Sequence, residues 1–273
     1  MVFNEYHTQY AALAPYIHSY NVLEIEGNEI SDWERCMPDG YVKLYFFNGA
    51  IPFYKDAFGN TLHWKNGVGG HPIGDDLCFI KLPNENSRMV WASLKPYFLN
   101  WISNVPIHLV NNNVVPFDDI FEKNDFRLEN QIAEQDNHLK IIKLLDAFFM
   151  KQFLNCHNHE LKTIKIYNEI YSQNGLLNFE LLAKQNKVSM RTMQRNFAVQ
   201  MGMSPKHFAR IIRFNHAMKL RRENTECNWQ DIIYHCDYHD QSHFVHDVKS
   251  ITGSSPNIFF NDNNLIKNLH LGR

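Results

Sequence analysis

Three polar side chains that can read DNA bases recur at helical spacing late in the chain. Arg191, Gln194 and Arg195 stand at positions i, i+3 and i+4 and so share one face of a helix, and Ser189 stands where its N-cap belongs. Arginine pairs with guanine and glutamine with adenine through two hydrogen bonds in the major groove. The spacing therefore indicates a base-reading helix. An ordinary solvated helix face is the alternative.

Apolar residues on the opposite face indicate how such a helix is held in place. Val188, Met193, Phe197 and Met201 recur at helical spacing and are expected to point inward. The first copy starts at Glu180 and reads as two short helices around a tight turn, as in a helix-turn-helix unit, in which the first helix supports the second in the major groove.

The stretch from 177 to 260 contains this pattern twice. A shift of 51 positions superposes Gly202 on Gly253 and Pro205 on Pro256. The second copy predicts a recognition helix that begins at Asp240. The residues expected to contact DNA in the two copies are Ser189, Arg191, Thr192, Gln194, Arg195, Gln241, Ser242, His243, His246 and Lys249.

One apolar helix connects the two copies. Ser204 and Pro205 make a capped start with proline in the first turn. A helix of about 18 residues is roughly 27 Å long, so it would hold two recognition helices about one turn of DNA apart, near 34 Å.

The basic charge is concentrated with the repeat. Residues 1–159 carry 12 Lys and Arg against 19 Asp and Glu, whereas residues 160–260 carry 13 against 9. Such asymmetry favours a polyanion-binding part joined to an acidic part with another role.

The first half of the chain reads as short strands over 20–25, 41–47, 77–82 and 88–94, followed by helical patterns over 97–105 and 125–155. The predicted fold class is α+β: a β-rich N-terminal domain, then an all-α C-terminal domain with two helix-turn-helix units joined by a linker helix. The expected parts are a sensing or interaction domain (1–124), a helical connector that could dimerise (125–159), the DNA-binding domain (160–260) and a tail (261–273).

Other chemistry-bearing residues have plainer explanations. The five cysteines are scattered and form no Cys-x-x-Cys pair, which favours reduced thiols and a cytoplasmic protein. His235, His239 and His243 have a spacing that a metal could use, but a turn and a helix start explain them equally well. The glycines of 67–74 lack the Gly-Lys-Ser/Thr ending of a phosphate loop, so a β-turn or a pocket-lining loop is expected there. The tryptophans, with the surrounding Phe and Tyr, are expected in a β-domain core, with an effector pocket as the alternative.

Residues 177–260 resemble the DNA-binding domain of the AraC/XylS family of bacterial transcription regulators. The resemblance rests on 191–197, on 240–244 and on the two Gly-x-Ser-Pro endings. It implies that Arg191, Gln194 and Arg195, and then Gln241, Ser242 and His246, face bases. The second copy departs from the family pattern, which usually has Ala at Ile233, Gly at Asp237, Arg at His246 and Phe at Val248. The start of the chain, through 13–20 and 37–40, resembles an uncharacterised domain found on some such regulators.

These observations predict a transcription regulator that binds double-stranded DNA and is not an enzyme. No catalytic, metal or cofactor site and no membrane segment are expected. A second copy of the chain and a small-molecule effector remain open as partners, and RNA polymerase is expected if the protein is an activator. The alternatives are a DNA-binding tail on a repair-like enzyme with a cysteine methyl acceptor, or on a protein-docking domain.

Overall fold

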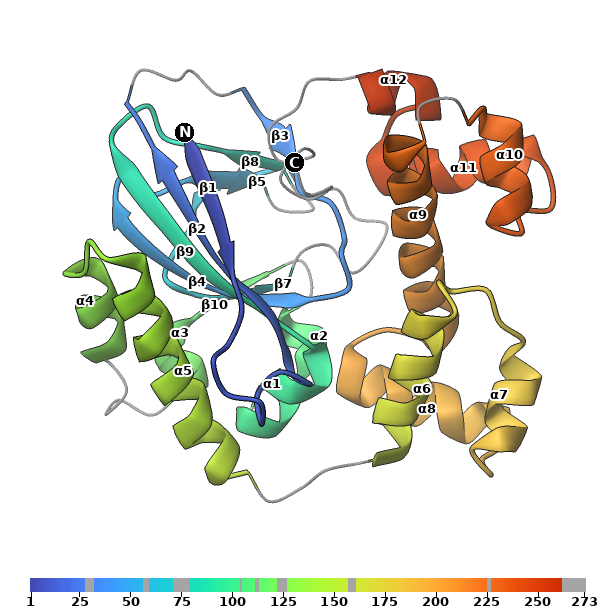
Figure 1. Ribbon diagram of the computed structural model, residues 1–273, viewed down its shortest axis with the longest axis horizontal. Coiled ribbons are helices and arrows are strands. Elements are labelled where there is room, and N and C mark those ends of the chain that lie inside the picture. The colour runs from blue at the N-terminus through green and yellow to red at the C-terminus, as the bar shows by residue number, and fades with distance from the viewer. Residues whose placement is uncertain are drawn as a thin grey trace. The chain divides into compact units, whose positions relative to one another are not determined.

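The computed structural model describes residues 1–27, 32–55, 59–70, 79–103, 105–110, 113–121, 127–156, 161–224 and 227–261. The chain divides into two compact units (Figure 1). The N-terminal unit takes its described residues from 1–34, 41–71 and 78–159. The C-terminal unit combines those of 160–273 with the short segment 35–40.

A six-stranded sheet forms the centre of the N-terminal unit. Its strand order is β1 (Val2–Tyr6), β2 (Ile17–Ile25), β9 (Ser87–Leu94), β4 (Val42–Gly49), β7 (Gly67–Gly70) and β10 (Val114–Pro116), and neighbouring strands are antiparallel. Every residue of β9 is buried, because this strand lies inside the sheet and both of its faces are covered. A four-stranded sheet has the order β3 (Glu34–Arg35), β8 (Phe79–Lys81), β5 (Phe53–Lys55) and β6 (Thr61–His63).

The long helix α5 (His138–Leu154) packs on the larger sheet through one apolar face. Phe149 stacks on Tyr20 of β2 with ring centroids 6.2 Å apart, and the buried carboxylate of Asp146 accepts hydrogen bonds from the Tyr20 hydroxyl (2.8 Å) and the Gln9 backbone N–H (2.9 Å). The apolar stripe expected to serve a dimer is therefore largely buried within its own chain. The other helices of this unit are α1 (Pro96–Ile102), α2 (Ile107–Val110), α3 (Phe117–Ile120) and α4 (Arg127–Ala133).

The aromatic residues of this unit are mainly core. Trp64 and Trp91 are buried, and both pack against Tyr45 at centroid distances of 5.0 and 6.3 Å. The glycine-rich stretch expected to be a turn or loop begins instead as strand β7, which pairs with β10. Glycine is needed at 67 because a Cβ there would lie 2.2 Å from the Val115 carbonyl oxygen of β10. The rest of that stretch lies outside the described residues.

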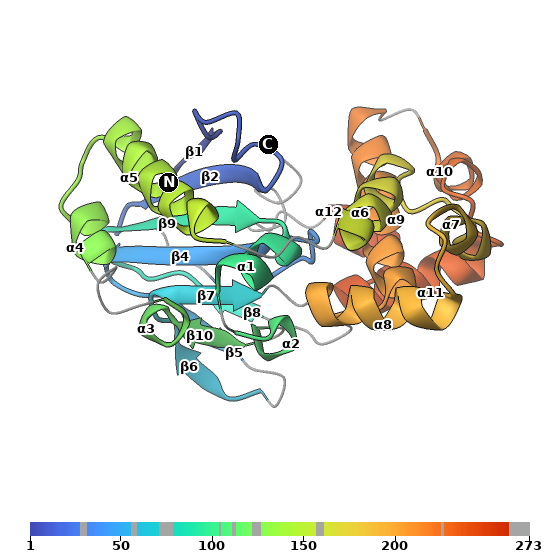
Figure 2. The same cartoon turned by 90° about the horizontal axis from the view of Figure 1, so that it is seen from below.

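Seven helices make up the described part of 160–273: α6 (Leu161–Ser172), α7 (Phe179–Gln185), α8 (Met190–Met201), α9 (Pro205–Glu223), α10 (Trp229–His235), α11 (Gln241–Thr252) and α12 (Pro256–Asn261). Helix α9 runs the length of the unit, with α6 to α8 at one end and α10 to α12 at the other (Figure 1). Seen along α9, helices α8 and α11 lie on the same side of it (Figure 2). The predicted α+β fold, with two helical pairs joined by a linker helix, is confirmed.

The segment 35–40 completes the core of the C-terminal unit. Met37 is 1% exposed within a cluster that includes Phe214 of α9 and Phe244 of α11. The Asn215 side-chain amide donates to the Pro38 carbonyl oxygen at 3.1 Å. Gly40 has φ +82°, and a Cβ there would lie 2.8 Å from the Phe208 ring. Residues more than 170 positions apart in the chain thus share one core.

Among the described residues, no helix is both long enough and apolar enough to cross a membrane.

Candidate DNA-binding site

The first recognition helix, α8, presents the side chains that the sequence singled out. Arg191, Gln194 and Arg195 are exposed, whereas Met193 and Phe197 are buried against the rest of the unit. The Ser189 hydroxyl caps the helix by accepting from the Thr192 backbone N–H at 3.1 Å.

Ser189 and Thr192, both predicted to contact DNA, also contact each other. Their hydroxyl oxygens lie 2.8 Å apart, and Thr192 is half-buried. The cap therefore occupies part of their hydrogen-bonding capacity and fixes the start of the helix on which Arg191 stands.

A short brace positions α8. Helix α7 is capped by the Asn178 side chain, which accepts from the Leu181 backbone N–H at 3.0 Å, and it buries Leu182 and Ala183. The turn into α8 passes through Lys187, whose φ of +53° lies in the left-handed region. This conformation is not predictable from the residue type, because lysine carries no particular preference for it.

The second unit repeats this construction. Asp240 caps α11 by accepting from the His243 backbone N–H at 2.7 Å, and Gly253 ends it with φ +75°, as Gly202 ends α8 with φ +74°. Asp237, which stands where the family usually has Gly, takes φ +49°. Aspartate can adopt this left-handed conformation, although less readily than glycine.

The exposed face of α11 carries Gln241, Ser242, His246 and Lys249. His243 is exposed as well but lies toward the flank of the helix, where its ring meets Tyr238 edge-on at 5.4 Å. The second recognition face therefore offers neutral donors and one lysine, and the first offers two arginines and a glutamine.

A buried ion cluster ties α11 to the linker helix. The Asp247 side chain is 4% exposed and accepts from Arg210, while Arg213 Nη2 lies 3.6 Å from its other carboxylate oxygen. Tyr238 donates to that same oxygen at 3.2 Å, and the Arg213 guanidinium lies over the Tyr238 ring at 4.4 Å. Arg210 also bonds Ser250. The sequence places both arginines on the linker helix, where their position alone predicts no particular partner. Asp247 on the buried face of α11 was the available signal for this cluster.

Burial and this cluster shift two neighbouring pKa values. Burial raises the pKa of the Tyr238 hydroxyl, and the Asp247 charge raises it further, so Tyr238 acts as a hydrogen-bond donor. Burial also raises the pKa of the Cys236 thiol to about 11, although the charge of Arg213 opposes the shift.

The sites weighed against DNA binding gain no support from the geometry. No group of three or more His, Cys, Asp or Glu in the described part of the chain could hold a metal ion. Instead, His235 Nδ1 lies 2.7 Å from the Asp231 carbonyl oxygen, and His239 Nδ1 lies 3.0 Å from the Asp240 carboxylate. Cys78 and residues 157–159 lie outside the described residues.

Residues 182–262 match a family model described as a helix-turn-helix domain. Among the curated relatives, the HTH-type transcriptional activator RhaS of Escherichia coli O157:H7 is 34% identical over 68 residues, which cover 25% of this chain and 24% of RhaS. RhaS of Escherichia coli strain SE11 is 32% identical over the same length. The chain thus matches about a quarter of the length of these relatives.

Residues 182–262 are therefore a helix-turn-helix domain, and the predicted resemblance to the AraC type is confirmed for this part of the chain. Among solved structures, ToxT of Vibrio cholerae is similar over 88% of this chain and 97% of its own, with 14% identity and a TM-score of 0.47. A likeness of that degree supports no statement about function.

Proposed function

We propose that the protein is a sequence-specific DNA-binding transcription regulator whose helices α8 and α11 enter successive major-groove segments of a promoter. The observation that carries this proposal is the pair of capped recognition helices on the same side of α9 (Figure 2). The 19 residues of α9 span roughly 28 Å at 1.5 Å per residue. This length suits two helices that must stand about 34 Å apart along DNA.

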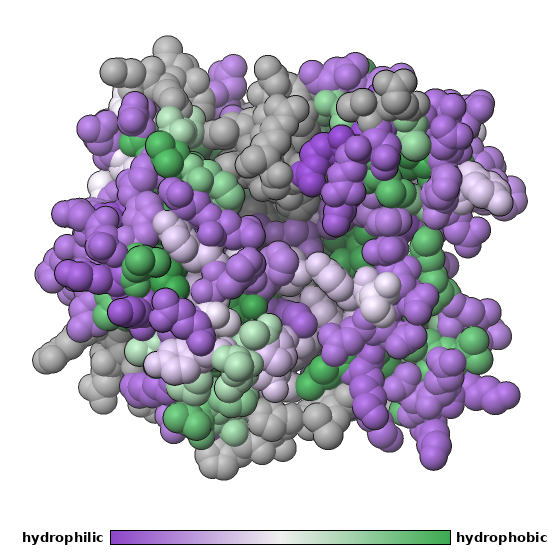
Figure 3. Space-filling model, in the orientation of Figure 1, coloured by the Kyte–Doolittle hydropathy of each residue, from purple (hydrophilic) through white to green (hydrophobic). Residues whose placement is uncertain are grey.

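In this proposal the two units contribute unequally. Arg191, Gln194 and Arg195 read base edges, since arginine and glutamine can make bidentate contacts there. Gln241, Ser242 and His246 make weaker base contacts, and Lys249 contacts a phosphate. Phosphate contacts supply much of the affinity, and base contacts supply the specificity. Figure 3 shows the face of the C-terminal helices on which α6 and α9 lie in front of α8 and α11, and hydrophilic side chains cover much of it.

Selection from a random DNA pool with the full chain tests the proposal. We expect a site with two preferred stretches about 10 base pairs apart, of which the stretch contacted by α8 is the more strongly specified. Insertion of about five base pairs between them should abolish tight binding, because it rotates one stretch to the opposite side of the duplex. A pool that emerges without sequence preference would refute the proposed function.

Arg195→Ala then tests the reading role itself. We expect a loss of about 1 to 3 kcal/mol on the selected site and relaxed base choice at one position. Lys140→Ala, an exposed change on α5 of the N-terminal unit, is the matched control and should leave both unchanged. An equal loss for Arg195→Ala on selected and random DNA would assign Arg195 to the phosphates instead.

We further propose that the N-terminal unit regulates the DNA-binding unit and that the protein is not an enzyme. Cys36, in the segment 35–40 of the C-terminal unit, is buried, which argues against the repair-like alternative because a cysteine methyl acceptor must reach its alkylated base. Thiol titration of the full chain with and without alkylated DNA tests the repair-like alternative: the loss of one thiol with alkylated DNA would establish it.

The N-terminal unit offers a site for a regulatory input. A cavity of 560 Å³ within the N-terminal unit is lined in part by Phe53, His63 and Lys81 and could admit a small effector. A second copy of the chain is a further candidate partner, as is RNA polymerase if the protein activates transcription. Sedimentation of the full chain with and without its selected DNA site would detect self-association.

A further inference from the structure

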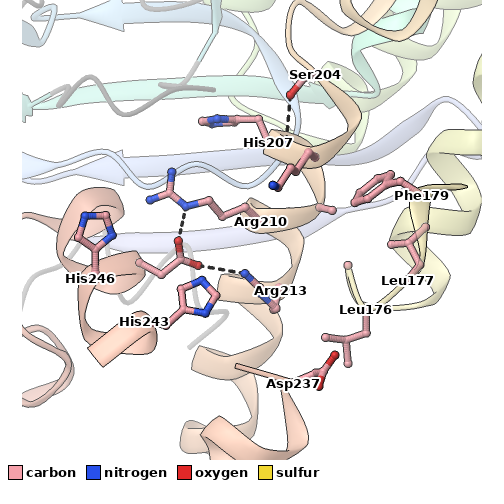
Figure 4. Close-up of a pocket in the computed structure, with 14 residues that line it drawn as sticks. Leu176, Leu177, Phe179, Ser204, His207, Arg210, Arg213, Asp237, His243 and His246 are labelled. Carbon is pink, nitrogen blue, oxygen red and sulfur yellow. Dashed lines mark hydrogen bonds and ion pairs between the residues drawn. The ribbon is translucent and has the colours of Figure 1, made fainter. Parts of the chain in front are cut away.

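A cavity of 470 Å³ lies within the C-terminal unit, between its two helix-turn-helix pairs (Figure 4). Its walls come from the segment that enters α7, from the first half of α9 and from α11. The lining side chains on which the inference depends are Lys206, His207, Arg210, Arg213, His243 and His246.

The cavity has a surplus of positive charge. Three lining side chains, Lys206, Arg210 and Arg213, are cationic, and two, Asp237 and Asp247, are acidic. The Asp247 carboxylate faces both arginines and can balance only one of them. Arg213 Nε is buried and has no hydrogen-bond acceptor among the described residues. The site therefore favours an anion that accepts several hydrogen bonds.

Neutral donors and an exposed lysine add to this preference. The imidazoles of His207, His243 and His246 each carry an N–H donor even when uncharged. Arg210 and Arg213 reach from α9 toward α11, which carries His243 and His246 (Figure 4). Lys206 is exposed in the first turn of α9 and can extend toward a bound group.

The position of the cavity between the two helix-turn-helix pairs favours a backbone phosphate of DNA as the bound anion. Two helices in successive major-groove segments on one side of a duplex straddle the backbone that runs between those segments. The first helix of a helix-turn-helix unit crosses the backbone, and the chain that leads into α7 forms one wall of the cavity through Leu177 and Phe179. His246, on the opposite wall, also lies on the exposed face of α11.

We propose that this cavity binds a backbone phosphate of the DNA between the two recognition helices. The proposal rests on the proposed function and adds a phosphate contact, made chiefly by Lys206, Arg210 and Arg213 of α9, to the contacts of the two recognition helices. Asp237 acts against the phosphate, so removal of its charge should strengthen binding, whereas removal of the Lys206 charge should weaken it. A purely structural role would not give changes of opposite sign.

The test measures affinity for selected and random DNA over a range of salt concentrations, using the full chain. Lys206→Gln should weaken the affinity for selected and for random DNA about 3- to 10-fold. It should also reduce the magnitude of the slope of log K against log salt by about 0.9, the value for one phosphate. Asp237→Asn should strengthen both, because asparagine also tolerates the left-handed backbone of that position. Lys219→Gln is the matched control, since Lys219 lies on the same helix, is 62% exposed and is not among the cavity residues.

A selected duplex with one uncharged methylphosphonate, placed in turn at each phosphate between the two stretches, locates the contact. One position should weaken the wild type and have no added effect on Lys206→Gln. If the wild type binds its site but Lys206→Gln and Asp237→Asn change neither affinity nor slope, the cavity proposal fails and the proposed function stands. If inorganic phosphate binds the cavity without competing with DNA, the site is for a free anion and the proposal is overturned. A wild type without sequence preference refutes the proposed function.

Discussion

Asp247→Asn removes a negative charge that joins the linker helix to α11 and nearly preserves the shape of the side chain. The remaining amide accepts with one oxygen, where the carboxylate contacts Arg210, Arg213 and Tyr238 with two. Removing one partner of a buried ion pair costs about 3 to 5 kcal/mol, because the other charge stays buried. The side chains of Arg210 and Arg213 are 21% and 19% exposed, so water recovers part of that cost. We therefore expect Asp247→Asn to lower the free energy of unfolding by about 3 kcal/mol, the low end of that range.

Urea denaturation followed by far-ultraviolet circular dichroism measures this loss in the helical unit. Glu223→Gln is the control, because its pairing with Lys219 at 3.9 Å is a surface contact, worth at most about 1 kcal/mol. In a double-mutant cycle, Arg210→Met and Asp247→Asn together should cost less than the sum of the single changes, with a coupling of about 0.5 to 3 kcal/mol. If the free energy of unfolding of Asp247→Asn lies within about 0.5 kcal/mol of the wild-type value, the ion cluster does not hold α11 on the linker helix, and the reasoning is refuted.

Three further experiments test the packing of α8, the Cys236 thiol and the cap of α11. Phe197→Ala should lower the free energy of unfolding by about 3 to 5 kcal/mol, because Phe197 is fully buried. Val199→Ala on the exposed side of the same helix should lower it by less than about 0.5 kcal/mol, and equal shifts of the two urea curves would contradict this. The Cys236 thiol, with its pKa raised to about 11 by burial, should resist a maleimide at pH 8 until the chain is unfolded, and fast labelling of the native protein, read by mass spectrometry, would disprove it. The hydrogen bond from the His243 backbone N–H lowers the pKa of the exposed Asp240 carboxyl in the folded protein. The Asp240 carboxylate therefore stabilises the fold fully at a pH above its pKa in the unfolded chain, and this stabilisation is lost as the pH falls through its pKa in the folded protein. Between pH 7 and pH 3 the melting temperature should therefore fall less for Asp240→Asn, which keeps the cap, than for the wild type. Equal falls in the two proteins would count against this role of Asp240.

The helical half of the fold could be predicted because its signals are local. Caps such as Ser189 and Asp240, and the glycines that end α8 and α11, act within one turn of the helices they delimit. The 51-residue repeat then placed the second unit by comparison with the first. Exposure of Arg191 and Arg195 followed from helical spacing alone.

The rest depends on contacts between distant positions. Asp247 meets Arg210 across 37 residues, and no periodicity links one to the other. Short strands such as β6 and β7 have too few residues for an alternating pattern to be recognised, and they are defined by their partners in the sheets. The role of Gly67 becomes clear only when β10 lies beside it.

The segment 35–40 makes the DNA-binding unit discontinuous along the gene. A fragment that starts near residue 160 would lack Met37 and the carbonyl group that Asn215 contacts. Loss of a buried methionine side chain leaves a void that costs about 2 to 5 kcal/mol. Recombination that exchanged the second half of this gene for that of a relative would therefore pair each α9 with a foreign 35–40 segment. The two stretches are expected to be inherited together, and hybrid regulators joined near residue 160 should be unstable unless both come from the same parent.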